Sequence, residues 1–129
     1  MFRVMCVDDN RDLADSEVML LRTHGYDARA CYDGPGAIRL AATFRPTVCL
    51  IDLNMPGMDG DELAGRLRAS WAGEPPVLIA VTAMNNEDAL RRIAEAFDQH
   101  LVKPVDPREL VRLIDAQAEV GRPDRPAGE

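Results

Sequence analysis

The chain has 129 residues and a mass of 14.2 kDa, the usual size of a single domain. Hydrophobic residues make up 47% and charged residues 29%, as in soluble globular proteins, and no apolar run approaches the ~18 residues of a membrane span. The net charge of −7, with no basic patch to offset it, argues against direct binding to nucleic acid or to an anionic membrane.

The N-terminus and the cysteines favour a cytoplasmic location. The first nine residues, MFRVMCVDD, contain neither the long apolar segment nor the cleavage site of a secretory signal. Cys6, Cys31 and Cys49 are odd in number, lie in apolar stretches and have no spacing typical of a metal site. We therefore expect reduced, buried thiols.

In chain order, short apolar runs alternate five times with amphipathic stretches. The runs predict strands at 3–7, 27–31, 47–51, 77–81 and 99–102. Four of the five are nearly all apolar, as expected for strands that are covered on both faces. The alternation predicts an α/β fold with a mostly parallel sheet.

Between the predicted strands, apolar residues recur with the helical period. From the first helix to the fifth, the faces expected to be buried are Ala14, Val18 and Leu21; Ala37, Ile38, Ala41 and Ala42; Leu63 and Leu67; Ala89, Ile93 and Phe97; and Leu110, Leu113 and Ile114. The tail that follows, GRPDRPAGE, has no apolar face. We expect one domain over 1–120 and a disordered polar tail over 121–129.

Helix starts and turns also have local signals. Asp59 with Glu62, and Asp106 three residues before a second glutamate, are typical of capping boxes at the third and fifth helices. In the turn before the third helix, NMPGMDG, we expect Gly57 and Gly60 to adopt unusual backbone angles.

Evidence of function first appears where the predicted strands end. Asp8 and Asp9 follow the first strand, and Asp52 follows the third. Thr82 follows the fourth strand, and Lys103, the only lysine beside fourteen arginines, follows the fifth. Because the carboxyl ends of parallel strands share one edge, these groups should meet there. Each residue alone could be a turn former, a helix cap or a surface charge, but their coincidence indicates a site.

Three neighbouring carboxylates repel one another, at about 4 kcal/mol per pair for a separation of ~4 Å and an effective dielectric constant near 20. Either some of them are protonated or a cation lies among them. Oxygen ligands in a wet cleft suit Mg²⁺ (or Mn²⁺), which also binds phosphate oxygens. The residues therefore suit a phosphoryl group carried on a carboxylate. The compact ammonium of Lys103 can act as a point charge toward a carboxylate and a phosphoryl group, whereas a guanidinium requires a planar, bidentate arrangement.

Four motifs resemble the receiver domain of two-component response regulators, of the chemotaxis-regulator type. They are VDDN after the first strand, LIDLNMPGMDG after the third, VTA after the fourth and LVKP after the fifth. The resemblance covers about residues 3–119. It implies a flavodoxin-like (βα)5 three-layer sandwich with a five-stranded parallel sheet in the order 2-1-3-4-5.

The resemblance also implies roles for individual residues. Asp52 corresponds to the phosphoacceptor. Asp8 and Asp9 correspond to the acidic pair that holds Mg²⁺ together with Asp52 and the backbone carbonyl of Asn54. Lys103 corresponds to the lysine that pairs with the phosphoryl group.

The switch residues show one departure from the family pattern. Thr82 corresponds to the switch hydroxyl, and a cis bond is expected before Pro104. The second switch position, usually tyrosine or phenylalanine, is His100. One interpretation is a half-buried ring that packs as an aromatic would. The sharper hypothesis is that His100 moves inward with Thr82 and makes the switch sensitive to pH, because imidazole changes charge near neutrality.

The family likeness predicts a signalling protein rather than an enzyme acting on an external substrate. A sensor histidine kinase or phosphotransfer protein would donate the phosphoryl group, and the surface of the fourth helix, fifth strand and fifth helix would then bind a downstream partner. The sequence names neither protein. It also leaves open whether phosphorylation drives dimerisation, and whether the chain acts alone or belongs to a hybrid kinase.

Two other functions remain as alternatives. An aspartyl-phosphate phosphohydrolase would place an aspartate two residues after the nucleophile, where this chain has Asn54. A pseudo-receiver would bind partners without phosphorylation, but the acidic set is complete, which disfavours this alternative.

Overall fold

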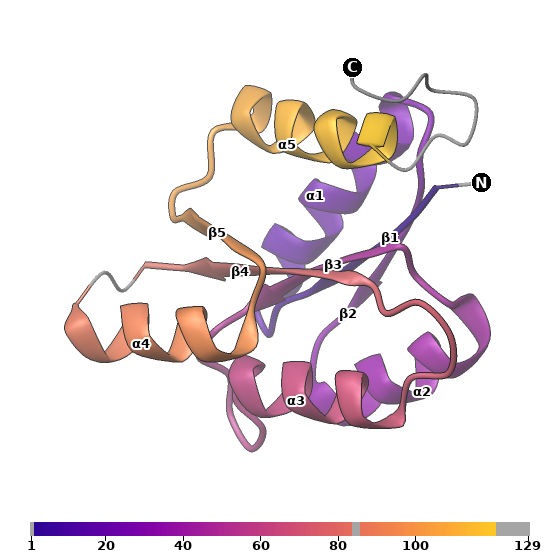
Figure 1. The fold of residues 1–129 in the computed structure, drawn as a ribbon. Coiled ribbons are helices and arrows are strands. Elements are labelled where there is room, and N and C mark those ends of the chain that lie inside the picture. Colours follow the sequence, from indigo (N-terminus) through magenta and orange to yellow (C-terminus); the bar gives the residue numbers. More distant parts are fainter. Residues whose placement is uncertain (1, 84–85, 121–129) are drawn as a thin grey trace.

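The computed structural model describes residues 2–83 and 86–120. Five strands and five helices alternate along the chain (Figure 1). They are β1 (Arg3–Val7), α1 (Arg11–Thr23), β2 (Asp27–Cys31), α2 (Gly34–Phe44), β3 (Val48–Asp52), α3 (Gly60–Ser70), β4 (Val77–Thr82), α4 (Glu87–Ala96), β5 (Gln99–Val102) and α5 (Pro107–Val120). The five predicted strands are confirmed, with bounds that agree to within one residue. The tail predicted from 121 onward lies outside the described residues.

The strands form one parallel sheet in the order β2-β1-β3-β4-β5. Figure 1 shows α1 and α5 on one face of this sheet and α2, α3 and α4 on the other. The predicted flavodoxin-like three-layer sandwich is therefore confirmed. Among the helices of the described ranges, none combines the length and the apolar character that crossing a bilayer requires.

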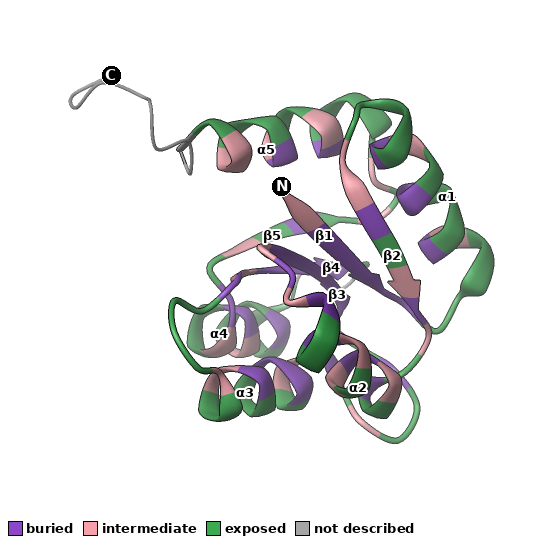
Figure 2. Ribbon diagram, turned by 90° about the vertical axis from the view of Figure 1, so that its right-hand side faces the viewer, coloured by how far each residue is buried: buried purple, intermediate pink, exposed green. Residues whose placement is uncertain are grey.

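Each face of the sheet has its own hydrophobic core, because side chains alternate along a strand. On β1, Val4 and Cys6 belong to the core beneath α1 and α5, whereas Met5 and Val7 belong to the core beneath α2, α3 and α4. Figure 2 shows strands that are mostly buried and helices that are buried on their inner sides. All three cysteines are buried and free, as expected.

The predicted helix faces are buried or half-buried, with one exception. Ala37 and Ala41 of α2 are buried and Ile38 is half-buried, but Ala42 is exposed. The buried stripe of α2 continues to Phe44, and a residue directly after Ala41 is turned about 100° away from that stripe. The prediction for Ala42 was wrong for this reason.

Two predictions about the turn before α3 need correction. Asp59 precedes the helix, but its carboxylate makes no capping bond and instead accepts from the backbone N–H of Met55 at 3.2 Å. Gly57 has the expected positive φ of 82°, whereas Gly60 does not. A side chain at Gly60 would collide with the backbone carbonyl oxygen of Asp52, so glycine is required there by close approach rather than by backbone angles. At α5, the carboxylate of Asp106 does accept from a helix N–H, that of Arg108, at 2.9 Å.

Candidate functional site

The sheet register brings the predicted site residues to one edge. Val7 is aligned with Ile51, so Asp8 lies beside Asp52 at the ends of β1 and β3. Thr82, the last residue of β4, is aligned with Val102, and Lys103 follows directly. The backbone N–H of Lys103 donates to the Thr82 carbonyl at 2.9 Å, which fixes the end of β5 against β4.

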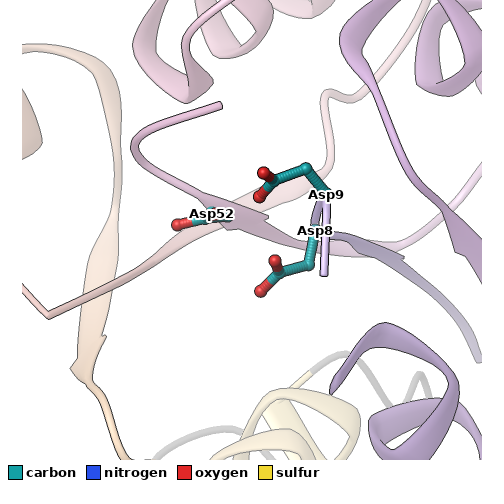
Figure 3. Close-up of side chains that lie close together, drawn as sticks. All are labelled: Asp8, Asp9 and Asp52. Carbon is teal, nitrogen blue, oxygen red and sulfur yellow. The ribbon is translucent and has the colours of Figure 1, made fainter. Parts of the chain in front are cut away.

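Three carboxylates meet at this edge. One oxygen from each of Asp8, Asp9 and Asp52 lies within 4.8 Å of the others. Figure 3 shows Asp8 and Asp9 at the end of β1, with their carboxylates on the same side of the sheet edge as that of Asp52. Asp8 and Asp52 are only 2% and 6% exposed, whereas Asp9 is exposed. The cluster therefore has two buried acids and one at its solvent side.

Lys103 connects the two buried acids. Its Nζ lies 3.1 Å from Asp8 Oδ2 and 3.4 Å from Asp52 Oδ1. The other oxygen of Asp8 accepts from the backbone N–H of Asn10 at 2.9 Å. The Lys103–Pro104 peptide bond is cis. Because Nζ lies close to both carboxylates, the ammonium can remain in contact with Asp8 while it also faces Asp52.

The electrostatics of the cluster favour an added cation. Burial raises the pKa of Asp52 most, the charge of Asp8 and a hydrogen bond with Asp9 also raise it, and Lys103 lowers it, so that the pKa is about 7. Three carboxylates against one ammonium leave a formal excess of two negative charges in the cluster formed by these described residues. An all-oxygen donor set with that excess fits a hard divalent cation such as Mg²⁺.

The remaining predicted residues lie on β4, on β5 and in the loop after β3. Thr82 is buried at 1% exposure on the end of β4, and Asn54 is exposed in the loop that follows β3. His100, expected to be half-buried, is exposed on β5. Side chains alternate along β5, and Leu101 takes the buried position while His100 and Val102 are exposed, so the packing interpretation was wrong for this structure.

Sequence reasoning missed Glu17. Its side chain lies on the buried face of α1, and its Oε2 has no hydrogen-bond partner within residues 2–83 and 86–120. Burial and the charge of Asp8 raise the pKa of Glu17 and Lys103 lowers it, so that the pKa is about 7. The spacing could have revealed this residue, because Glu17 occupies the same helical face as Ala14, Val18 and Leu21.

Arg92 was also missed. It lies on α4 with its side chain only 16% exposed, and it donates hydrogen bonds to Asp61 and to Asn54. No local pattern separates it from the neighbouring Arg91, which is exposed and pairs with Asp88 on its own helix.

The sequence matches the family model of the response regulator receiver domain over residues 4–115. The chain belongs to this family. The DNA-binding response regulator MtrA of Mycobacterium tuberculosis is 32% identical to this receiver over 115 residues, which are 89% of this chain and 50% of MtrA. The chain thus spans about half the length of the curated MtrA proteins that it matches.

Two further relatives match nearly the whole receiver. An uncharacterised 14.6 kDa protein from the sodA1 3′ region of Leptolyngbya boryana is 34% identical over 122 residues, 94% of this chain and 93% of that protein. The solved structure of a CheY-like response regulator receiver domain from Methylobacillus flagellatus has a TM-score of 0.80 and 25% identity. That match covers 91% of this chain and 98% of the other. Receiver domains bind Mg²⁺ at an acidic pocket, and the Asp8, Asp9 and Asp52 cluster lies at the corresponding edge of this sheet.

Proposed function

We propose that this receiver is a phosphorylation-dependent switch whose phosphoacceptor is Asp52. A sensor histidine kinase or a phosphotransfer protein donates the phosphoryl group, and the domain acts on no external substrate. The observation that carries the proposal is the position of Asp52, which is buried beside a second buried acid, with the only lysine of the chain in contact with both. We place the protein in the cytoplasm, with the receiver over 1–120 and a polar tail beyond it.

The metal ligands follow from the same cluster. Asp8, Asp9 and Asp52 would hold Mg²⁺ or Mn²⁺, with the Asn54 backbone carbonyl as a further ligand. The bound cation supplies positive charge that neutralises the carboxylates and the phosphoryl oxygens. The protein's own part is to keep Asp8 and Asp52 on adjacent strand ends, so that the donor oxygens are arranged before the cation arrives.

In the transfer itself, a carboxylate oxygen of Asp52 attacks the phosphorus of a phosphohistidine. The new P–O bond forms as the P–N bond breaks, and the imidazole nitrogen leaves with the electron pair. Only the ionised carboxylate is a nucleophile, and burial with Asp8 nearby holds the pKa of Asp52 at about 7. Lys103 opposes this effect and favours the ionised form.

After transfer, Lys103 would pair with a phosphoryl oxygen while it stays beside Asp8. The Thr82 hydroxyl would donate to another oxygen, and Thr82 and His100 would move together as the switch. The output surface would comprise α4, β5 and α5. Leu90 of α4 and Val102 of β5, each 47% exposed, support this assignment because large apolar side chains in solvent often mark a binding surface.

Intact mass spectrometry tests the function. We expect incubation with a small phosphodonor to add the mass of one phosphoryl group in the presence of Mg²⁺, and to add none with chelator or in the Asp52→Asn variant. Asp27→Asn, at the opposite end of the sheet, is the matched control and should be modified like the wild type. Equal modification of the wild type and Asp52→Asn, or none in either, would contradict the proposal.

A further inference from the structure

We propose that Arg92 of α4 is a positioning residue for the phosphoacceptor site, because it holds the loop between β3 and α3 in the arrangement that binds the cation. The inference rests on the proposed function, since Asn54 in this loop is the proposed carbonyl ligand. Nothing in the family resemblance assigned a role to Arg92. The evidence is a set of five contacts that the guanidinium makes to α3 and to the loop of residues 53–59.

One side of the guanidinium is fixed on α3. Nε donates to Asp61 Oδ2 at 3.0 Å and Nη2 donates to Asp61 Oδ1 at 2.8 Å, which is a two-pronged pair. Such a pair determines the plane of the guanidinium as well as its position. The contact also lowers the pKa of Asp61, through its hydrogen bonds with Arg92.

The remaining donors reach the loop that leaves the phosphoacceptor. Nη1 donates to the side-chain oxygen of Asn54 at 3.1 Å, and Nη2 lies 3.4 Å from the carbonyl oxygen of Leu53. Nη2 also lies 3.6 Å from Asp59 Oδ2. Arg92 therefore contacts both residues that directly follow Asp52.

The anchor on α3 is itself fixed relative to Asp52. The backbone N–H of Gly60 donates to the Leu53 carbonyl at 2.8 Å, and the Asp52 carbonyl leaves no room for a side chain at Gly60. Asp61 is the next residue. Arg92 thus connects Asn54 to a part of α3 whose distance from the phosphoacceptor is set by direct backbone contact.

A second arginine shows what Arg92 adds. Arg68 of α3 donates to the Ala96 carbonyl at 2.6 Å and to Asp98 Oδ2 at 3.1 Å, so it joins α3 to the far end of α4. These two hydrogen bonds of Arg68 lead away from the loop of residues 53–59. Both arginines hold the helix pair together, but only Arg92 also holds Asn54.

Because Arg92 is positively charged, the direction of the change in Mg²⁺ affinity on its removal tests the proposal. If Arg92 acted only through its charge, removing it would strengthen the binding of a cation, because like charges repel. If Arg92 positions the loop, removing it should weaken binding, and loss of such outer contacts around a metal site usually costs roughly tenfold to 100-fold in affinity. The two explanations therefore predict opposite changes.

The experiment is a calorimetric titration with Mg²⁺ of the wild type, Arg92→Met, Arg91→Met and Arg68→Met. We expect Arg92→Met to bind Mg²⁺ roughly tenfold more weakly than the wild type. Arg91→Met makes the same charge change one residue away, and Arg68→Met cuts the other contact between the helices, so both should stay within about twofold. Arg92→Lys keeps the positive charge but loses the two-bond pair with Asp61. Its affinity for Mg²⁺ should therefore be closer to that of Arg92→Met than to that of the wild type.

A second readout needs no metal. Hydrogen exchange of the backbone amides of residues 53–55 should be faster in Arg92→Met than in Arg68→Met, with both proteins in chelator. If Arg92→Met does not fold, Arg92→Gln removes the same charge and the same two-bond pair with Asp61, keeps a polar side chain and should weaken Mg²⁺ binding in the same direction. Affinity that is unchanged or tighter in these variants overturns the inference and leaves the proposed function standing. A wild type that binds no Mg²⁺ overturns both.

Discussion

The two ends of the sheet use charged residues in opposite ways. At the amino ends of the strands, Arg3 Nε donates to the Arg45 carbonyl at 2.8 Å, and the guanidinium of Arg45 lies 4.0 Å from the centre of the Trp71 ring and donates to the Ala72 carbonyl. At the carboxyl ends, Asp8, Asp9 and Asp52 lie together, and Lys103 contacts Asp8 and Asp52. At the amino ends, the arginines are hydrogen-bonded to backbone carbonyl oxygens. At the carboxyl ends, negative charge exceeds positive charge.

This difference identifies the functional end better than the shape of the surface does. A cavity of about 390 Å³ opens at the amino end, bordered by Arg3, Arg45 and Trp71. Its arginines are already bonded to carbonyl oxygens, so it offers little uncompensated charge to a ligand. At the acidic edge the repulsion between carboxylates would be relieved by a bound cation, and that relief is the source of its chemistry.

The largest effect should come from Gly60→Ala. The added methyl group would meet the backbone carbonyl of Asp52, and because backbone cannot rotate aside we expect a loss of about 3 kcal/mol in unfolding free energy. Gly73, in the loop before β4 at the amino end, has φ of 85° and open space around it, so Gly73→Ala should cost about 1 kcal/mol. Urea unfolding of both variants measures the difference, and equal losses would argue against the tight packing at Gly60.

The buried carboxyl of Glu17 should make stability depend on pH. Its pKa is about 7 in the folded protein and 4.5 ordinarily, so folding takes up a proton between these values. Below pH 4.5 the carboxyl is protonated in both the folded and the unfolded protein and costs no stability through its charge. The unfolding free energy then falls as the pH rises from 4.5 to 7. Glu17→Gln should stabilise the protein by about 2 kcal/mol at pH 8 and leave it nearly unchanged at pH 4.

Urea unfolding at both pH values, in chelator, checks the prediction for Glu17. Glu95→Gln, an exposed change on α4, is the control and should stay within about 0.5 kcal/mol at either pH. A Glu17→Gln protein whose stability follows the wild-type pH curve would contradict the account.

Charge-conserving substitutions at the two ends of the sheet should differ in their effect on phosphorylation, and Lys103→Arg is the one that should reduce it. A guanidinium keeps the charge but cannot place one compact donor between Asp8 and Asp52, so we expect phosphorylation, or the structural change that follows it, to fall roughly tenfold. The reciprocal change at the other end, Arg3→Lys, should leave phosphorylation unaffected. Mass spectrometry gives the first quantity and chemical shifts of α4 and β5 give the second. Wild-type values for both in Lys103→Arg would refute the assigned role.

The smallest effect is expected for His100→Phe. If the imidazole couples the switch to pH, the phosphorylation-induced shifts of β5 should vary with pH in the wild type and not in the variant. We expect the change to stay below about fivefold, the lower end of usual coupling between sites. His24→Gln, on the exposed end of α1, controls for the loss of a histidine. Identical pH profiles for the wild type and His100→Phe would remove the hypothesis.

The sequence was sufficient where a local pattern determines the position. Asp8, Asp52 and Lys103 could be placed together because apolar runs mark strands, and parallel strands share a carboxyl edge. Arg92 could not be found in this way, since its role depends on how α4 is rotated against α3, and Arg91 has the same chemistry. Asp59 illustrates the same limit, because its carboxylate accepts a hydrogen bond from the backbone N–H of Met55 in the loop and not from the helix N–H groups.

The most direct test of the account is the location of the phosphoryl group. Borohydride reduces an aspartyl phosphate to homoserine, so reduction after phosphorylation with Mg²⁺, followed by peptide mass spectrometry, identifies the modified residue. The account predicts homoserine at Asp52 and at no other aspartate. A modification at Asp8 or Asp9, or on a histidine, would contradict the assignment of Asp52 as the phosphoacceptor.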